Sequence, residues 1–203
     1  MAPPPSQDSL VESPAFTLFA AGFRPFFSAA GAYALLGLIA WLWIYATGMQ
    51  PLPHRPAQLW HGHEMLYGFV AAAIAGFLLT AVPSWTGTRG VAGTPLIVLA
   101  ALWLTGRLAF AAAAMLPLSL VAVCELAFIP VLGGLLAPPL LRARNRNSPL
   151  LLVLAGVWLT DVVFLYALMR DDVPLARTTL LVAIDIVLLL VTVIGGQIGR
   201  AHV

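Results

Sequence analysis

The stretch LWHGHEMLYGFVAAAIAGFLLTAV, residues 59–82, places a polar cluster directly before an almost purely apolar run. About 20 helical residues are needed to cross the hydrocarbon core of a bilayer, and the apolar run with its neighbours is long enough to do so. The polar part holds two histidines, a glutamate and a methionine. The stretch therefore predicts a membrane-spanning helix with candidate ligands at one end.

The composition of the whole chain agrees with a membrane protein. Its 203 residues are 61% hydrophobic and 9% charged, whereas a soluble domain carries about 25% charged residues. The lipid bilayer is thus the expected partner, and protein partners are left open. A net charge of +2 gives no reason to expect nucleic-acid binding. The single cysteine, Cys124, excludes a disulfide framework and a cysteine-based metal cluster.

Six apolar runs are long enough to span the membrane, and Pro- or Gly-containing segments separate them. They are too long and too uniformly apolar to be barrel strands. We expect an all-α, polytopic transmembrane helix bundle with six helices, at about 26–46, 63–82, 95–114, 118–141, 149–169 and 178–196.

The arginines predict the orientation, because basic residues are more frequent on the cytoplasmic side. With the N-terminus in the cytoplasm, the inner side holds the larger group: Arg24, Arg89, Arg142, Arg144 and Arg146. The outer side holds Arg55, Arg170 and Arg177. We expect a protein of the bacterial inner membrane, with the histidine cluster at the periplasmic end of the second helix.

Both ends of the chain differ from this membrane domain, which covers 18–196. Residues 1–17 are rich in Pro and Ser and lack the basic start of a signal peptide, so we expect a disordered leader. Residues 197–203 read QIGRAHV, and codons for IGRAHV spell a common sequencing adapter. We expect a non-native tail there, and hence an N-terminal fragment.

Few charged residues lie inside the apolar runs, and each needs a partner or a task because charge in hydrocarbon is costly. Arg107 lies in the third run, and four acidic residues lie in the others: Glu64, Glu125, Asp161 and Asp185. One interpretation is structural, with Arg107 fastening helices together through one of these acids. The other is a polar interior near a cofactor or a proton path. The sequence does not decide between them.

Helical spacing divides the polar cluster between two faces. Residues three or four apart share a face, which groups His61 with Glu64 and Met65. His63 lies about 200° round the helix from His61, with Tyr67 beneath it. The two histidines therefore serve different centres unless Gly62 breaks the helix.

Imidazole is a common haem ligand, and a thioether suits haem or copper(I). A proton-handling or purely structural histidine pair explains the same residues. The metalloprotease motif is absent, because Tyr67 stands where its second histidine is required.

Four motifs together resemble the NnrS family. They are LFAAGFRPFF (18–27), LWHGHEMLYGF (59–69), AIAGFLLTAVPSWTGTRG (73–90) and LTGR (104–107). The resemblance implies a bacterial membrane protein of the nitric oxide response that contains haem and copper and has about twelve transmembrane helices. It implies protection against nitrosative stress, with nitric oxide or a derived species as the ligand.

Carried onto this chain, the resemblance matches family motifs at His61, His63 and Met65. Of these we expect His61 and His63 to be ligands, with Met65 as a further metal ligand. Glu64 becomes the partner of a histidine, Arg107 a partner of a haem propionate, and Arg24 a further cofactor-binding residue. Tyr67, Glu125, Asp161 and Asp185 are expected in supporting roles. The chain departs from the family at Ser84, where Asn is usual, and at Leu165, where a His is frequent.

Two other functions remain open on the sequence alone. One is a transporter or channel without a redox centre, and the other is an assembly factor for respiratory complexes. The sequence contains no recognisable catalytic motif, so whether the protein is an enzyme is undecided. Any activity would be haem- or copper-centred redox chemistry.

Overall fold

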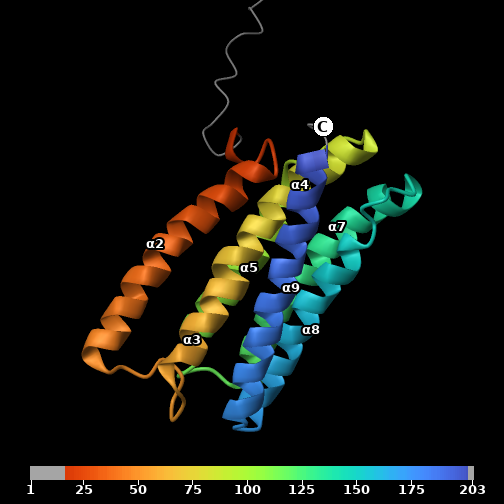
Figure 1. The fold of residues 1–203 in the computed structure, drawn as a ribbon. Coiled ribbons are helices and arrows are strands. Elements are labelled where there is room, and N and C mark those ends of the chain that lie inside the picture. The colour runs from red at the N-terminus through yellow and green to blue at the C-terminus, as the bar shows by residue number, and fades with distance from the viewer. Residues whose placement is uncertain (1–16, 201–203) are drawn as a thin grey trace, which may run out of the picture.

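The computed structural model describes the backbone of residues 17–200 and the side chains of residues 17–196. Within this part of the chain all regular elements are helical (Figure 1), and six helical segments are long and apolar enough to cross a membrane. The expected all-α, six-span bundle is confirmed. Most of the expected leader, residues 1–16, and the last residues of the expected tail, 201–203, lie outside the described residues.

The elements follow the chain as α2 (Phe23–Thr47), α3 (Ala57–His63), η2 (Glu64–Val70), α4 (Ala71–Thr86), α5 (Thr94–Ala111), α6 (Leu118–Leu126), α7 (Phe128–Arg142), α8 (Leu150–Met169) and α9 (Val173–Arg200). Elements α3, η2 and α4 together form the second span, and α6 with α7 forms the fourth. Glycines in the left-handed conformation end two spans, at Gly48 (φ 67°) and Gly87 (φ 66°). Only glycine adopts this conformation without strain.

The second span begins at Ala57, six residues earlier than the apolar pattern predicts. Pro56 precedes it, and proline favours helix starts because it lacks the N–H that the first turn leaves unpaired. The histidines therefore lie inside the helix rather than at its mouth. Gly62 does not break it, since α3 continues directly into η2.

Element η2 is a π-helix, a wider turn that is common at functional sites. It shifts the register of the side chains that follow His63. The Trp103 indole nitrogen of α5 donates a hydrogen bond of 3.0 Å to the carbonyl of Gly68 in this segment. The irregular backbone is thus partly stabilised by a neighbouring helix, as irregular backbone within a membrane requires.

A proline accounts for the break between α6 and α7 in the fourth span. Pro130 has no N–H to donate to the carbonyl four residues earlier, that of Leu126. The Trp158 indole nitrogen of α8 donates to this carbonyl at 3.0 Å instead. The interruption between α6 and α7 is therefore compensated by a side chain from the next span.

Small residues of the second span allow α2 to pack closely against it. A Cβ atom added at Gly68 would lie 2.4 Å from the Tyr33 ring, and one at Gly76 would lie 3.1 Å from the Phe27 ring. The sequence leaves open whether this stripe of small residues admits a neighbouring helix or a flat macrocycle. At these positions the aromatic side chains of α2 fill the space.

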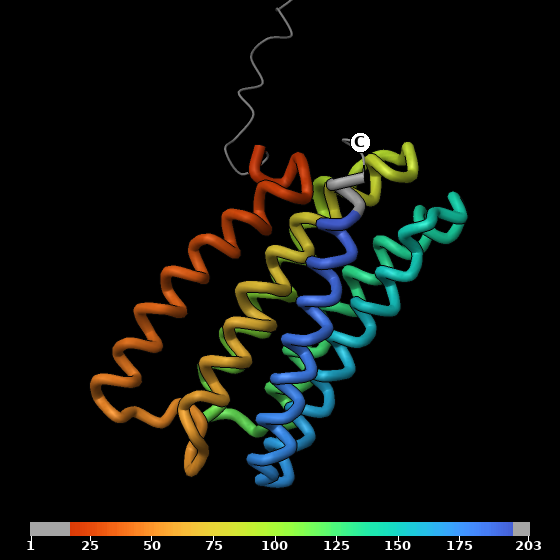
Figure 2. The backbone as a smooth tube through the Cα atoms, viewed as in Figure 1, coloured from red at the N-terminus to blue at the C-terminus, as the bar shows by residue number. Residues whose placement is uncertain are grey.

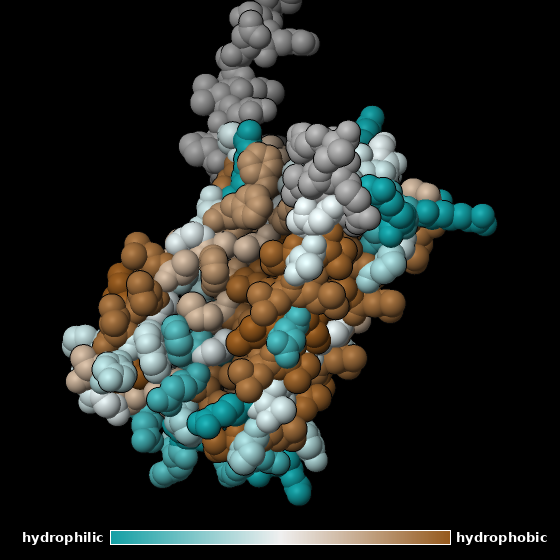
Figure 3. Space-filling view, viewed as in Figure 1, coloured by the Kyte–Doolittle hydropathy of each residue, from teal (hydrophilic) through white to brown (hydrophobic). Residues whose placement is uncertain are grey.

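Hydrophilic side chains gather at the two ends of the bundle, and a broad apolar band separates them (Figure 3). At the end where α8 meets α9, Arg55 pairs with Asp171 and donates a 2.7 Å hydrogen bond to the Leu168 carbonyl. This contact ties the loop after α2 to the turn between α8 and α9.

Replacing Gly68 by alanine should destabilise the bundle, because the new Cβ would overlap the Tyr33 ring. Overpacking of this kind costs about 1–3 kcal/mol. Gly134→Ala is the matched control, since nothing lies within 4 Å of its added Cβ. Thermal unfolding in detergent should show a lower midpoint for Gly68→Ala alone; equal midpoints would show that Tyr33 can move aside.

Candidate metal centre

Arg107 of α5 lies at the centre of a buried ionic cluster. Its side chain is 5% exposed, its Nη1 donates to Glu64 Oε1 at 2.7 Å, and its Nη2 pairs with Glu125 Oε2. Glu64 comes from η2 and Glu125 from α6, so the guanidinium links three spans. The structure thus identifies the acids that contact Arg107, which the sequence could not do.

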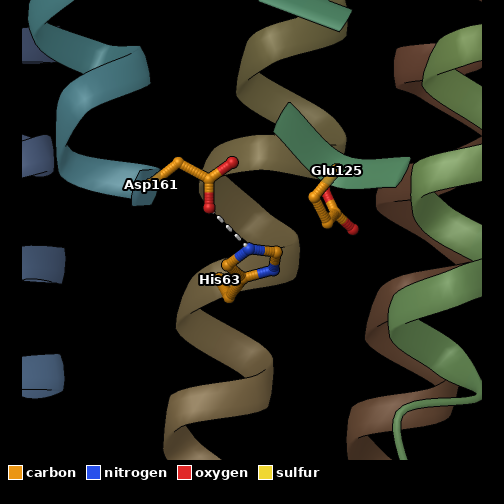
Figure 4. Close-up of side chains that lie close together, drawn as sticks. All are labelled: His63, Glu125 and Asp161. Atoms are coloured by element: carbon orange, nitrogen blue, oxygen red, sulfur yellow. Dashed lines mark hydrogen bonds and ion pairs between the residues drawn. The ribbon is translucent and has the colours of Figure 1, made fainter. Parts of the chain in front are cut away.

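His63 extends this cluster to the fifth span, α8. Its imidazole is fully buried, with Nε2 3.1 Å from Asp161 Oδ1 of α8 (Figure 4) and Nδ1 3.1 Å from Glu64 Oε1. A neutral imidazole carries one N–H, so it can donate to only one of two carboxylates. The other ring nitrogen then offers a lone pair, which is what a metal ion binds.

Aromatic rings enclose the imidazole of His63. Its ring centroid lies 3.8 Å from that of Phe110, 4.9 Å from Phe164 and 4.8 Å from Tyr67. The Tyr67 hydroxyl donates to Thr160 Oγ1 at 3.0 Å, which holds the tyrosine ring in place. These contacts fix the orientation of the imidazole and separate it from lipid.

Three potential metal ligands converge here, and the imidazole of His63 is one of them. One donor atom each from His63, Glu125 and Asp161 lies within 4.8 Å of the others, and all three side chains are buried (Figure 4). Glu125 Oε1 and Glu64 Oε2 are also buried and have no hydrogen-bond partner among the described residues. The cluster can therefore bind a cation without first breaking every existing contact.

The formal charge of the cluster also favours a cation. Glu64, Glu125 and Asp161 oppose the single positive charge of Arg107, so two negative charges remain when all three carboxylates are ionised. Isolated charge in a medium of low dielectric is strongly unfavourable. A divalent ion would balance the two charges.

His61 and Met65 lie on a different side of the second span and contact α2. The His61 ring stacks on Trp41 with centroids 4.4 Å apart, and its Nδ1 is buried without a hydrogen-bond partner among the described residues. The Met65 methyl lies 2.8 Å from the position of a Cβ added at Gly37. Of the expected face of His61, Glu64 and Met65, only His61 and Met65 face α2, while Glu64 turns toward Arg107.

Two expected site residues lie apart from the cluster. Arg24, in the first turn of α2, donates to the Thr17 carbonyl at 2.8 Å. It precedes Trp41, the α2 contact of His61, by 17 residues, or roughly 25 Å of helix. Asp185 is exposed on the outer surface of α9.

The structure adds three residues to the candidate site: Phe110, Thr160 and Phe164. Phe110 follows Arg107 by three positions, and Phe164 follows Asp161 by three. This spacing places each ring on the same helix face as a charged residue. The signal was present in the sequence, but apolar residues at this spacing are common in every span.

The comparisons with known proteins give one match. The family model described as NnrS protein matches residues 17–200. No curated protein matches this chain, and neither does any solved structure.

Removing the positive charge of the cluster should strongly destabilise the protein. Arg107→Gln leaves Glu64 and Glu125 buried without their cation, a change that typically costs about 3–5 kcal/mol. The double variant Arg107→Gln with Glu125→Gln should recover part of this loss, because it removes one of the stranded carboxylates.

Arg89→Gln is the control for this comparison, because Arg89 is exposed and its replacement should change stability by less than about 0.5 kcal/mol. Unfolding in detergent with a denaturant series measures all three variants. An Arg107→Gln protein as stable as the wild type would contradict a structural role of the cluster.

Proposed function

We propose that this chain, which belongs to the NnrS family, is a metal-binding membrane protein that protects bacteria against nitric oxide. Copper and haem are the cofactors in this proposal. The observation that carries it is the buried group of His63, Glu125 and Asp161. It combines an imidazole with two carboxylates and leaves negative charge that a metal ion would neutralise.

Copper fits this group better than a hard cation does. Imidazole nitrogen suits copper, iron and zinc, and among divalent first-row metals copper binds a given set of ligands most tightly. A copper ion supplies one-electron redox chemistry and a coordination position for a small ligand. Nitric oxide is small and uncharged, so it dissolves in lipid and can reach a centre between helices.

The neighbouring residues would orient the ligands. In this proposal His63 Nδ1–H donates to Glu64 Oε1, 3.1 Å away, which would fix the tautomer and leave Nε2 as the ligand atom. Arg107 holds Glu64 and Glu125 in place and offsets part of their charge. The rings of Phe110 and Phe164 cover the imidazole and exclude water.

The same contacts do not fit a haem at His63. A porphyrin must lie across the lone pair of the ligating nitrogen, and each ring nitrogen of His63 already faces a carboxylate oxygen at 3.1 Å. Both Nη groups of Arg107 also contact carboxylates already, and the guanidinium is buried between the spans, which does not suit a haem propionate as its partner. We therefore assign haem in this proposal to His61, whose Nδ1 is without a partner in the described structure.

Copper analysis of the purified full-length chain tests the metal centre. We expect stoichiometric copper in the wild type and its loss in His63→Gln and in Asp161→Asn, which keeps the side-chain volume. Glu64→Gln should bind copper about 10–100-fold more weakly, because it disturbs a partner of the ligand rather than the ligand itself. The visible spectrum of the same samples reports haem.

His61→Gln is the matched control, since it changes the neighbouring histidine on the other helix face. It should keep copper and lose the haem band. A wild type that binds neither copper nor haem would reject the proposal, and equal copper in the wild type and His63→Gln would reject these ligands. Growth of a host exposed to a nitric oxide donor should be protected by the wild type and not by His63→Gln.

A further inference from the structure

A cavity lies between α4 and α7, near the last residues of both helices. The loops that follow these two helices lie at the same end of the bundle (Figure 2). The cavity has a volume of about 460 Å³, and ligand sites in proteins typically enclose about 300–1,000 Å³. It is separate from the ionic cluster around Arg107, because the two have no residue in common.

The floor of this cavity is apolar. Pro83 of α4 and both Pro138 and Pro139 of α7 line it. The compact rings of three prolines fill less of the space between two helices than long side chains would. Leu79 also lines the floor and lies seven residues before the end of α4, so the cavity extends roughly 10 Å along the span. The cavity therefore reaches from the end of the helices into the apolar band.

Two arginines line the open side of the cavity. Arg89 lies in the loop after α4, Arg142 lies in the last turn of α7, and both are exposed. Within the part of the chain that the structure describes, neither guanidinium forms a hydrogen bond or an ion pair. No acidic residue lines the cavity. The two positive charges are therefore available to an anionic ligand.

The two threonines of the cavity have already used their hydroxyl hydrogens. Thr86 Oγ1 donates to the Val82 carbonyl at 2.8 Å and lies 2.9 Å from Thr88 Oγ1. A hydroxyl group carries one hydrogen, so Thr88 is the donor in the second contact. Among the side chains that line the cavity, the arginines are thus the donors that remain for a ligand.

We propose that this cavity binds an acidic phospholipid, with the phosphate at Arg89 and Arg142 and an acyl chain on the apolar floor. Guanidinium groups bind phosphate oxygens in a bidentate manner, and basic pockets between transmembrane helices are sites for acidic lipid headgroups. The apolar floor favours a lipid over free phosphate, because inorganic phosphate has no apolar part to place there. This inference does not depend on the metal centre.

Native mass spectrometry of the full chain in detergent, titrated with phosphatidylglycerol, tests the site. The wild type should bind this lipid more tightly than phosphatidylcholine with the same acyl chains, which has no net charge. Arg89→Gln combined with Arg142→Gln should weaken the binding of the first phosphatidylglycerol roughly 10–30-fold, because both cations near the phosphate are lost. The matched control is Arg144→Gln combined with Arg146→Gln, which removes the same charge from the loop after α7, outside the cavity. It should change the affinity by less than about twofold, since exposed charges at a distance are screened.

Three results would overturn the proposal. One is equal weakening in the two double variants, which would show a general attraction to the basic end of the bundle. The others are equal affinity for phosphatidylcholine, and displacement of the lipid by inorganic phosphate at the same concentration.

A lysine pair separates lost binding from lost folding. Arg89→Lys combined with Arg142→Lys keeps both charges and should recover part of the phosphatidylglycerol binding, although lysine lacks the bidentate geometry. Neither arginine has a partner within the described fold, so both pairs of variants should keep the wild-type unfolding midpoint in lipid-free detergent. A lysine pair that folds normally and binds no better than the glutamine pair would overturn the role of the two charges.

Discussion

The buried positive charge of Arg107 constrains much of this fold. Lipid cannot solvate a guanidinium, so the protein must provide its counter-charges. Glu64 and Glu125 do so directly, and the contact of His63 with Asp161 extends the cluster to the fifth span. The second, third, fourth and fifth spans are thereby held in one arrangement by polar contacts. The cluster holds three acidic side chains and one arginine, and this excess of negative charge makes it a candidate metal centre.

The sequence predicts part of this arrangement. The six spans follow from length and hydropathy, and the NnrS resemblance is confirmed over residues 17–200. The spacing of His61 and His63 predicts opposite faces, and the structure shows them there because Gly62 remains helical. The position of Glu64 could not be predicted, since η2 is a π-helix and alters the regular spacing. Which acids reach Arg107 depends on helix packing, which no local pattern encodes.

Asp161 and Asp185 illustrate the same limit. Both are aspartates near the middle of an apolar run, and the sequence treats them alike. In the fold Asp161 is 2% exposed beside His63, whereas Asp185 faces outward from α9. The physical rule is common to both, because neither can remain without a partner in hydrocarbon. Asp161 meets it within the chain, whereas Asp185 has no partner among the described residues.

The central claim is that His63, Asp161 and Glu125 hold a copper ion. X-ray absorption at the copper edge, recorded on the copper-loaded full-length protein, tests it most directly. The account predicts nitrogen and oxygen neighbours with the signature of one imidazole, and loss of that signature in His63→Gln. A sulfur neighbour from Met65, or two imidazoles bound to the same ion, would contradict it.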